Sequence, residues 1–484
     1  MFRIIHSNKF AILIIFFAFL GSCFLSINNL QKYDKNIQNS NNTFYHQMIK
    51  YDTLRFMGGG DEIKDQIKKG VSFFMTGSES FTKYLPSRIA AAYYYFFNID
   101  LFIDSKKEII RSGIHLPYLI IQSAFYYFSL LILYFSIKKI FGYNVCILTI
   151  IFLSIEPTIL QYHSTFWSES YFFSLQIILL SLIIRERKKL FDFFLIGLLS
   201  GFMALQKELA YFYIFIILFY YSFFFKEKIK PVAFIFFSFL LVQLIYGYNN
   251  YKRSGEFYIF PATTKFDLHL LIVKDVVTKK ENITSKDFFL NEGTEALNWM
   301  QRNSIKFKLS KKITKPDLWD YRVSILSEKE RVAFDGFILE RSKYYFFKYP
   351  LDFATHAFIK SVHILLLNPF HVYSDHKYPS GEIYYTSKEH KDLIPYRIIY
   401  TLIIYLIILI GLLKIIKKKY FPINIYLFFS IFYFYITISW HGNTRYILPS
   451  FIYLSIFFGF GFNTIINFLI KNFNKIDKQK KITL

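Results

Sequence analysis

The chain has 484 residues, of which 54% are hydrophobic and 21% aromatic, and a formal net charge of +24. Long uncharged apolar runs recur along it, which excludes an ordinary soluble protein and predicts a polytopic membrane protein. The positive charge does not indicate nucleic acid as a partner, because the basic residues flank the apolar runs. We predict an all-α integral membrane protein with about ten transmembrane helices, at residues 10–28, 115–137, 140–156, 168–184, 191–206, 209–225, 231–248, 397–413, 421–439 and 446–468.

The first apolar run admits two interpretations. Cys23 follows a Leu-Gly-Ser sequence that loosely resembles a lipoprotein cleavage site, and residues 1–22 resemble a signal peptide. We interpret the run as an uncleaved helix, because its removal would leave an odd number of helices and spoil the charge pattern. Cys23 and Cys146 both lie in apolar runs, so we do not expect a structural disulfide.

The short loops divide sharply by charge. If the helices alternate in direction, the short loops on one side, 157–167, 207–208 and 440–445, carry only Lys207 and Arg445 as basic residues. The positive-inside rule places the other, basic side in the cytoplasm together with both termini, as expected for a bacterial cytoplasmic (inner) membrane. The basic residues on that side are Arg3, Lys9, Lys138, Lys139, Arg185, Arg187, Lys188, Lys189, Lys226, Lys228, Lys230, Lys414, Lys417, Lys418, Lys419, Lys471, Lys475, Lys478, Lys480 and Lys481.

Two long loops then face outward. We predict that residues 1–248 form an N-terminal transmembrane catalytic module, with a first outer loop at 29–114. Residues 249–396 are long enough for a small extracytoplasmic domain. Within them, 352–370 is apolar but interrupted by two His and one Lys, which favours an amphipathic helix at the membrane interface over a further span. The C-terminal helices at 397–468 and a basic cytoplasmic tail at 469–484, suited to anionic lipid head groups, complete the chain.

Three glycines, Gly58 to Gly60, precede Asp61 and Glu62 in the first outer loop. One interpretation is a helix start, with Asp61 as the N-cap and Gly70 at the C-terminal cap. The functional interpretation is that this acidic pair faces the outer side of the membrane and takes part in catalysis.

Three further polar groups fall on the same predicted face. His163 lies before the fourth predicted span and Glu169 at its start, and Lys207 and Glu208 form the turn after the fifth. Each has a structural alternative: Glu169 as a helix cap, Lys207 and Glu208 as a solvated turn, and His163 as a hydrogen-bonded interfacial residue. The last group is His441, Arg445 and Tyr446 before the final span.

Arg445 is the hardest of these residues to explain structurally, because the positive-inside rule disfavours a cation in an outer loop. A guanidinium group at that depth suits a phosphate head group. A carboxylate nearby can act as a general base on an acceptor hydroxyl, and cations stabilise a leaving phosphate. The sequence contains no nucleotide-binding loop, metal-binding motif or Gly-x-Ser-x-Gly elbow. These residues favour group transfer from a lipid phosphate at the outer surface.

The chain resembles the GT-C polytopic glycosyltransferases, in particular the bacterial relatives of the protein O-mannosyltransferases and of the lipid A aminoarabinose transferase. The order and spacing of five stretches carry the resemblance over most of residues 1–265 and 420–465. They are Asp61-Glu62, Lys83-Tyr84-Leu85-Pro86, the segment from His163 to Glu169, the segment from Gly197 to Lys207, and Arg445-Tyr446-Ile447-Leu448-Pro449.

The resemblance implies inverting transfer of a sugar from a polyprenyl-phosphate carrier to a glycolipid, polysaccharide or protein outside the cytoplasm. It implies that Asp61, alone or with Glu62, acts on the acceptor or holds a divalent cation such as Mg²⁺ or Mn²⁺, and that Arg445 lies near the carrier phosphate. Lys207 departs from the usual Arg of the family. The loop at 266–396 matches no known pattern, so the identity of the acceptor stays open.

Two other classes of function compete with this interpretation. An O-antigen polymerase or ligase also acts outside the cytoplasm on lipid-linked sugars, but the early acidic loop and the Arg-Tyr-x-Leu-Pro turn fit it less well. A polytopic transporter usually carries ionisable groups at the middle of its spans and often has inverted repeats. This sequence has neither feature.

Overall fold

The computed structural model describes residues 8–35, 54–73, 84–99, 112–186, 188–225, 229–259, 263–309, 316–367, 388–415, 420–438 and 447–480. Within these ranges the regular structure is helical, and the β contact found is one isolated bridge between Phe307 and Ile325. The described part of the chain therefore has the predicted all-α class.

A helix covers each of the ten predicted transmembrane segments. These helices are α2 (Asn8–Lys35), α6 (Ser112–Phe141), α7 (Tyr143–Ile155), α9 (Glu169–Ile184), α10 (Leu190–Gln206), α11 (Tyr213–Phe224), α12 (Ile229–Ser254), α19 (Lys388–Ile415), α20 (Phe421–Ile438) and α21 (Leu448–Lys480). Their positions follow from long apolar sequences, and charged residues gather at their ends.

Not all of these helices are long enough to cross a bilayer. Among the described residues, five combine the length and apolar composition of a membrane span, namely α2, α6, α12, α19 and α21. A sixth span results if α7 and residues 157–164, which meet at a bend of 47°, are taken together. Helices α9, α10, α11 and α20 are apolar but shorter. The count of ten spans therefore stays a prediction, because the apolar runs that suggested it include helices well under the length of a span.

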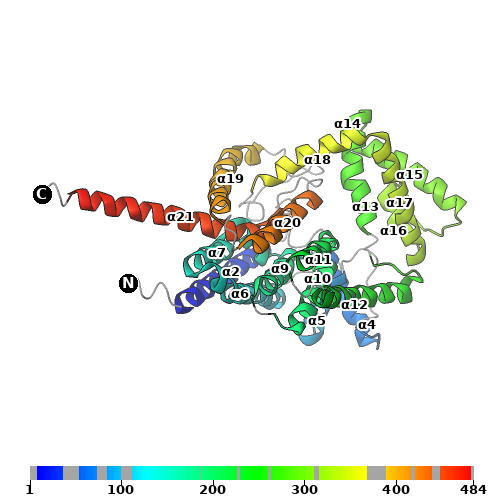
Figure 1. Cartoon of the computed structure of the whole chain (residues 1–484). Helices are drawn as coiled ribbons and strands as arrows, with labels where there is room; N and C mark the ends of the chain where they lie inside the picture. The colour runs from blue at the N-terminus through cyan, green and yellow to red at the C-terminus, as the bar shows by residue number, and fades with distance from the viewer. Residues whose placement is uncertain are drawn as a thin grey trace.

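The ends of the helices lie as an alternating topology requires. Figure 1 shows the start of α2 and the end of α21 on the left of the helix assembly and helices α13–α17 on the right. On the side of the termini, the hydroxyl of Tyr134, near the end of α6, donates to Asn8 at the start of α2 over 2.9 Å. At the other end, Tyr400 near the start of α19 donates to Glu156 after α7 over 2.6 Å.

Residues 263–309 and 316–367 form a compact helical layer. They contain α13 (Thr263–Leu268), α14 (Lys274–Glu281), α15 (Ser285–Arg302), α16 (Leu318–Ser324), α17 (Glu328–Lys348) and α18 (Pro350–Leu365), with a π-helical turn, η5 (His269–Val273), after α13. Apolar side chains from α13, α15, α16 and α17 form a core of their own. This stretch is thus folded, as its mixed composition predicted.

Two buried ionic groups stabilise this layer. Arg322 makes two hydrogen bonds of 2.7 Å to Asp335, and both side chains are buried. Glu292 accepts hydrogen bonds from Arg341 and Tyr345 and lies 3.2 Å from His269. Burial raises the pKa of Glu292, but His269 and Arg341 outweigh this effect and lower it to about 2.

Two contacts attach the layer to the membrane helices. At the end of α12, Arg253 pairs with Glu328 of α17 at 2.5 Å. At the start of α19, the buried guanidinium of Arg397 donates to the carbonyls of Leu366 and Leu367, which follow α18. The layer is therefore attached to α12 through the start of α17, and to α19 through the residues that follow α18.

Helix α18 corresponds to the predicted interfacial helix at 352–370. It begins at Pro350 and ends at Leu365, and it is not among the helices long and apolar enough to span a membrane. Phe358 and Val362 are 71% and 54% exposed on it. An exposed apolar side on a helix that also carries Lys360 is the pattern of a surface helix, and its position at a membrane interface stays a prediction.

Close packing of α10 on α12 explains the glycines in one of the five stretches quoted above. A Cβ atom on Gly197 would lie 2.2 Å from the carbonyl oxygen of Ile235, and one on Gly201 would lie 2.7 Å from the Cβ of Val242.

We expect Gly197→Ala to destabilise the protein by about 1–3 kcal/mol, since the two backbones have to separate. Thermal unfolding in detergent measures the effect. Gly21→Ala is the control, because nothing lies within 4 Å of its Cβ position, and equal stability of both variants would contradict the prediction.

The alternating topology also predicts where reporters should appear. A reporter fused after Leu484 should give a cytoplasmic signal, and one inserted after Ser304, between α15 and α16, should give an external one. Ser304 lies in a turn at the end of α15, so an insertion there leaves the helices intact. The same signal from both positions would overturn the assignment of sides.

Candidate functional site

Two of the predicted polar groups meet in a buried ion pair. The ammonium of Lys207 lies 2.6 Å from the Oε1 atom of Glu169, and the side chains are 4% and 1% exposed. Next to it, the amide of Gln206 donates to the carbonyl of Ser168 over 3.0 Å. The structural alternatives for Glu169 and Lys207, a simple cap and a solvated turn, therefore do not describe this arrangement. Glu208 begins a short 3-10 turn, η4 (Glu208–Ala210), and is partly exposed.

The local backbone brings these two side chains together. Lys207 ends α10 in an extended conformation, with φ of −145° and ψ of 127°, which turns the chain out of the helix. Glu169 is the first residue of α9, where a carboxylate is favourable next to the positive end of the helix. A buried pair of this type needs both partners, because either charge alone is costly away from water.

The segment between α7 and α9 folds back into the protein. Glu156 caps the short helix α8 (Pro157–Leu160) by accepting a hydrogen bond from the backbone of Ile159. A 3-10 turn, η3 (Gln161–Ser164), follows. Gln122 of α6 donates to the carbonyls of His163 and Thr165 at 3.1 and 2.9 Å, and so holds the segment against the helices.

His163 is packed inside this segment. Its Nδ1 atom lies 2.6 Å from the hydroxyl of Ser170, and its ring centroid lies 3.8 Å from that of Tyr126. The imidazole is fully buried. The geometry therefore favours a positioning role between α6 and α9 over direct contact with a substrate.

Asp61 and Glu62 point to different surroundings. Asp61 is buried and its Oδ1 atom lies 2.6 Å from the ammonium of Lys64, which is also buried and donates to the carbonyl of Ile99. Glu62 is exposed. The predicted N-cap role of Asp61 is wrong: a π-helical turn, η1 (Leu54–Gly58), leads into α4 (Gly59–Lys68), so Gly58 is the N-cap and Asp61 lies in the first turn.

The C-terminal cap of α4 is as predicted. Gly70 has a φ of +87°, its backbone N–H donates to Ile67, and the N–H of Val71 donates to Gln66. This is the double hydrogen bond of a Schellman motif, which requires the left-handed conformation that glycine adopts at little cost.

Helix α5 (Tyr84–Phe96) covers Asp61. A Cβ on Gly60 would lie 2.6 Å from that of Ala90, so α4 and α5 approach very closely. Burial and the charge of Asp61 both raise the pKa of Tyr94 well above its ordinary value. The hydroxyl of Tyr94 in turn lies 3.1 Å from Nε2 of His115 in α6.

Three residues near Asp61 were missed in the sequence. Lys64 follows Asp61 by one helical turn, and this i, i+3 spacing is a usable signal for an ion pair. Tyr94 and His115 gave no such signal, because they come from different helices: Tyr94 is near Asp61 through tertiary packing, and His115 contacts Tyr94.

The motif that opens α5 has a clear structural role. The guanidinium of Arg88 lies 3.5 Å above the ring of Tyr84, and the rings of Tyr84 and Tyr246 meet edge to face at 4.8 Å. Arg88 is buried. These contacts fix α5 against α12, on the side of the structure that also carries Arg253.

The remaining predicted site residues, His441, Arg445 and Tyr446, lie outside the described residues. The described residues contain no group of three or more His, Cys, Asp or Glu side chains placed to hold a metal. Asp61 is paired with Lys64 and Glu62 is exposed, and a divalent cation at these two carboxylates stays a prediction.

The comparisons with known proteins give a distant structural likeness. No protein-family model matches the chain, and no curated protein is similar to it in sequence. Among solved structures it is similar to the archaeal oligosaccharyltransferase AglB from Archaeoglobus fulgidus, determined in complex with an inhibitory peptide and a dolichol-phosphate, with a TM-score of 0.46 and 12% identity. The alignment covers 96% of this chain and 52% of that one, so this chain spans about half of its length. At this level of similarity, function has to be argued from the residues of this chain.

Loss of one partner of the Glu169–Lys207 pair should be severe. We expect Lys207→Met to cost about 3–5 kcal/mol, because it leaves a buried carboxylate without its cation. The double variant Glu169→Gln/Lys207→Met should recover much of this loss, since it removes both charges. Thermal unfolding of the purified variants in detergent measures both effects. If Lys207→Met were as stable as the wild type, the pair would not stabilise the junction between the start of α9 and the end of α10.

Proposed function

We propose that the protein is a membrane glycosyltransferase that moves a sugar from a polyprenyl-phosphate carrier to an acceptor on the extracytoplasmic face, with inversion at the anomeric carbon. The observation that carries the proposal is the gathering of buried charged groups at one end of the helix assembly. One pair is Asp61 with Lys64, within the short helix α4. The other is Glu169 with Lys207, at the start of α9 and the end of α10. Such groups are costly next to hydrocarbon unless they are used or paired.

Asp61 is the proposed general base. Transfer requires that the acceptor hydroxyl attacks the anomeric carbon, gives its proton to a base, and displaces the carrier phosphate together with the bonding electrons. A base must be present as a carboxylate, and the ammonium of Lys64 at 2.6 Å is a partner for that charged form. The fixed Tyr94–His115 hydrogen bond beside it helps to hold the surroundings of Asp61 in one geometry.

We propose that cations act on the leaving group, the carrier phosphate. The carrier phosphate gains charge as the sugar leaves, and a fixed cation stabilises that charge. Arg445 is proposed for this role on the grounds of its residue type and predicted position. Lys207 is already paired with Glu169, so we assign this pair the role of fixing the segment between α7 and α9.

The arrangement of charge fits an ion-coupled transporter less well. The buried pair Glu169–Lys207 lies at the ends of two apolar helices, and Asp61–Lys64 lies in α4, which is not one of the apolar helices. Coupling in a transporter usually needs ionisable groups near the middle of the membrane. A lipid-linked polymerase or ligase differs from the proposal in its acceptor, and its products distinguish it.

The direct test is sugar transfer by purified protein from a panel of polyprenyl-phosphate sugars. We expect Asp61→Asn to lower the rate by about a hundredfold or more, because it removes the base. Asp65→Asn is the matched control: it lies on the same helix, 3.4 Å from Lys64, but its side chain is 45% exposed. Both variants should elute from a sizing column as the wild type does.

Normal turnover by Asp61→Asn would remove Asp61 from the site. Products with many added sugars would favour a polymerase. Failure of every carrier to bind would favour a transporter.

A further inference from the structure

A cavity of about 260 Å³ lies at the opposite end of the helix assembly from the candidate site. It is formed by the last turns of α6 and by the residues that follow α9. Asn8 at the start of α2 contacts Tyr134 and Lys138 near the end of α6, so the cavity lies on the same side as the start of α2. The sequence predicts that the basic loops lie on that side. The proposed function makes no use of this cavity.

The walls of the cavity change from apolar to charged along α6. Ile132 and Phe135 line its inner part, and Lys139 lines its outer part. Lys139 follows Ile132 by seven positions in α6, so the two residues are about 10 Å apart along the helix axis at 1.5 Å per residue. The cavity therefore runs from the charged end of the helix into the depth at which hydrocarbon begins, and its occupant should be amphiphilic.

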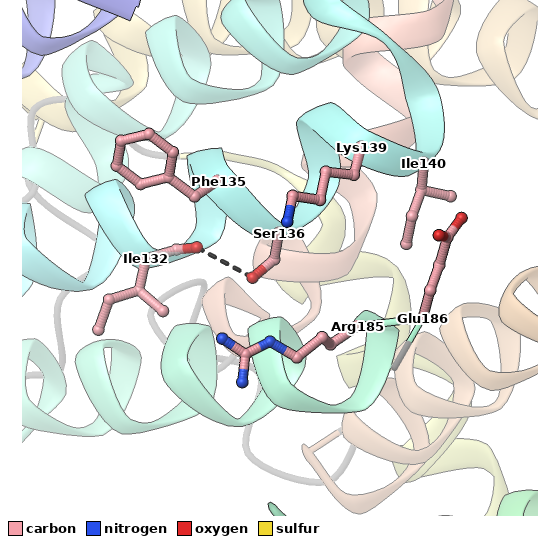
Figure 2. A pocket seen from close by; sticks show the side chains of 7 residues that line it. All are labelled: Ile132, Phe135, Ser136, Lys139, Ile140, Arg185 and Glu186. Carbon is pink, nitrogen blue, oxygen red and sulfur yellow. Dashed lines mark hydrogen bonds between the residues drawn. The ribbon is translucent and has the colours of Figure 1, made fainter. Parts of the chain in front are cut away.

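The residues that line the cavity include two cations, Lys139 and Arg185, and one carboxylate, Glu186. Figure 2 shows the nitrogen ends of Lys139 and Arg185 on either side of Ser136, and the carboxylate of Glu186 apart from them, near Ile140. Arg185 also pairs with Asp192 at 3.3 Å and remains 56% exposed. Lys139 is exposed and has no ion pair among the described residues. Two cations against one lining carboxylate leave an excess of one positive charge.

We propose that this cavity binds an anionic glycerophospholipid with a hydroxylated head group, of the phosphatidylglycerol type. The phosphodiester lies between Lys139 and Arg185, the head-group hydroxyls donate to Glu186, and an acyl chain packs against Phe135. One phosphodiester neutralises the excess charge of the lining residues. A zwitterionic choline lipid adds a cation beside Lys139 and Arg185 and offers no donor to Glu186.

The surroundings supply such a lipid. Phe135 is 47% exposed on α6, and Leu190 and Phe191 at the start of α10 are 49% and 63% exposed, so hydrocarbon-facing side chains flank the cavity. Basic residues next to the membrane concentrate anionic lipids at its surface. The bound lipid connects the end of α6 to the segment between α9 and α10, so its loss should also lower the thermal stability.

Native mass spectrometry of the delipidated, full-length protein tests the proposal. Phosphatidylglycerol and phosphatidylcholine with identical acyl chains are titrated separately, and the first bound lipid is quantified. We expect phosphatidylglycerol to bind more tightly, and Lys139→Gln/Arg185→Gln to weaken its binding about thirtyfold, given the usual effect of two basic residues near a membrane surface. Binding of phosphatidylcholine should not change.

Lys9→Gln/Lys471→Gln is the matched control, because it removes the same charge from exposed positions of α2 and α21 outside the cavity. Equal loss of binding in the control, or equal affinity of the wild type for the two lipids, would overturn the proposal. Should the double variant fail to fold, Lys139→Gln alone keeps the test decisive, since Lys139 makes no ion pair with described residues.

Discussion

The ion pair between Glu169 and Lys207 is the interaction on which one end of the helix assembly depends. It joins the start of α9 to the end of α10, and the same junction holds the hydrogen bond from Gln206 to Ser168. Charges in an apolar interior are stable only when each has its partner, so the pair fixes the positions of both helix ends. The folded-back segment between α7 and α9 and its buried His163 depend on this junction, because Ser168 and Glu169 end that segment.

The positions of the helices and the grouping of Glu169 with Lys207 could be predicted from the sequence. Apolar runs mark membrane helices, and alternating direction places distant helix ends on one side. The surroundings of Asp61 could not be predicted, because Tyr94 of α5 and its partner His115 of α6 are brought there by packing between helices. The N-cap assigned to Asp61 was wrong for a local reason: Gly58, Gly59 and Gly60 continue a helical path from Leu54, where a loop was expected.

A similar limit applies to the motifs behind the family resemblance. Gly197 and Gly201 are explained by the close approach of α10 to α12, and Tyr84 by its contacts with Arg88 and Tyr246. These contacts explain how the helices pack and assign no chemical role to the residues. The chemical part of the resemblance rests on Asp61, which is buried beside Lys64, and on Arg445, which lies outside the described residues.

The short helices have a consequence for the surrounding bilayer. Helix α9 has 16 residues and α10 has 17, so each is about 25 Å long, against a hydrocarbon thickness of about 30 Å. Hydrophobic mismatch of this kind makes lipids thin locally around a protein. If α10, α11 and α20, which carry exposed apolar side chains, cross the membrane, the bilayer beside them is expected to be thinner than elsewhere. For the lipid carrier that we propose, a thinner bilayer brings the head group closer to the helix ends at which Glu169 and Lys207 lie.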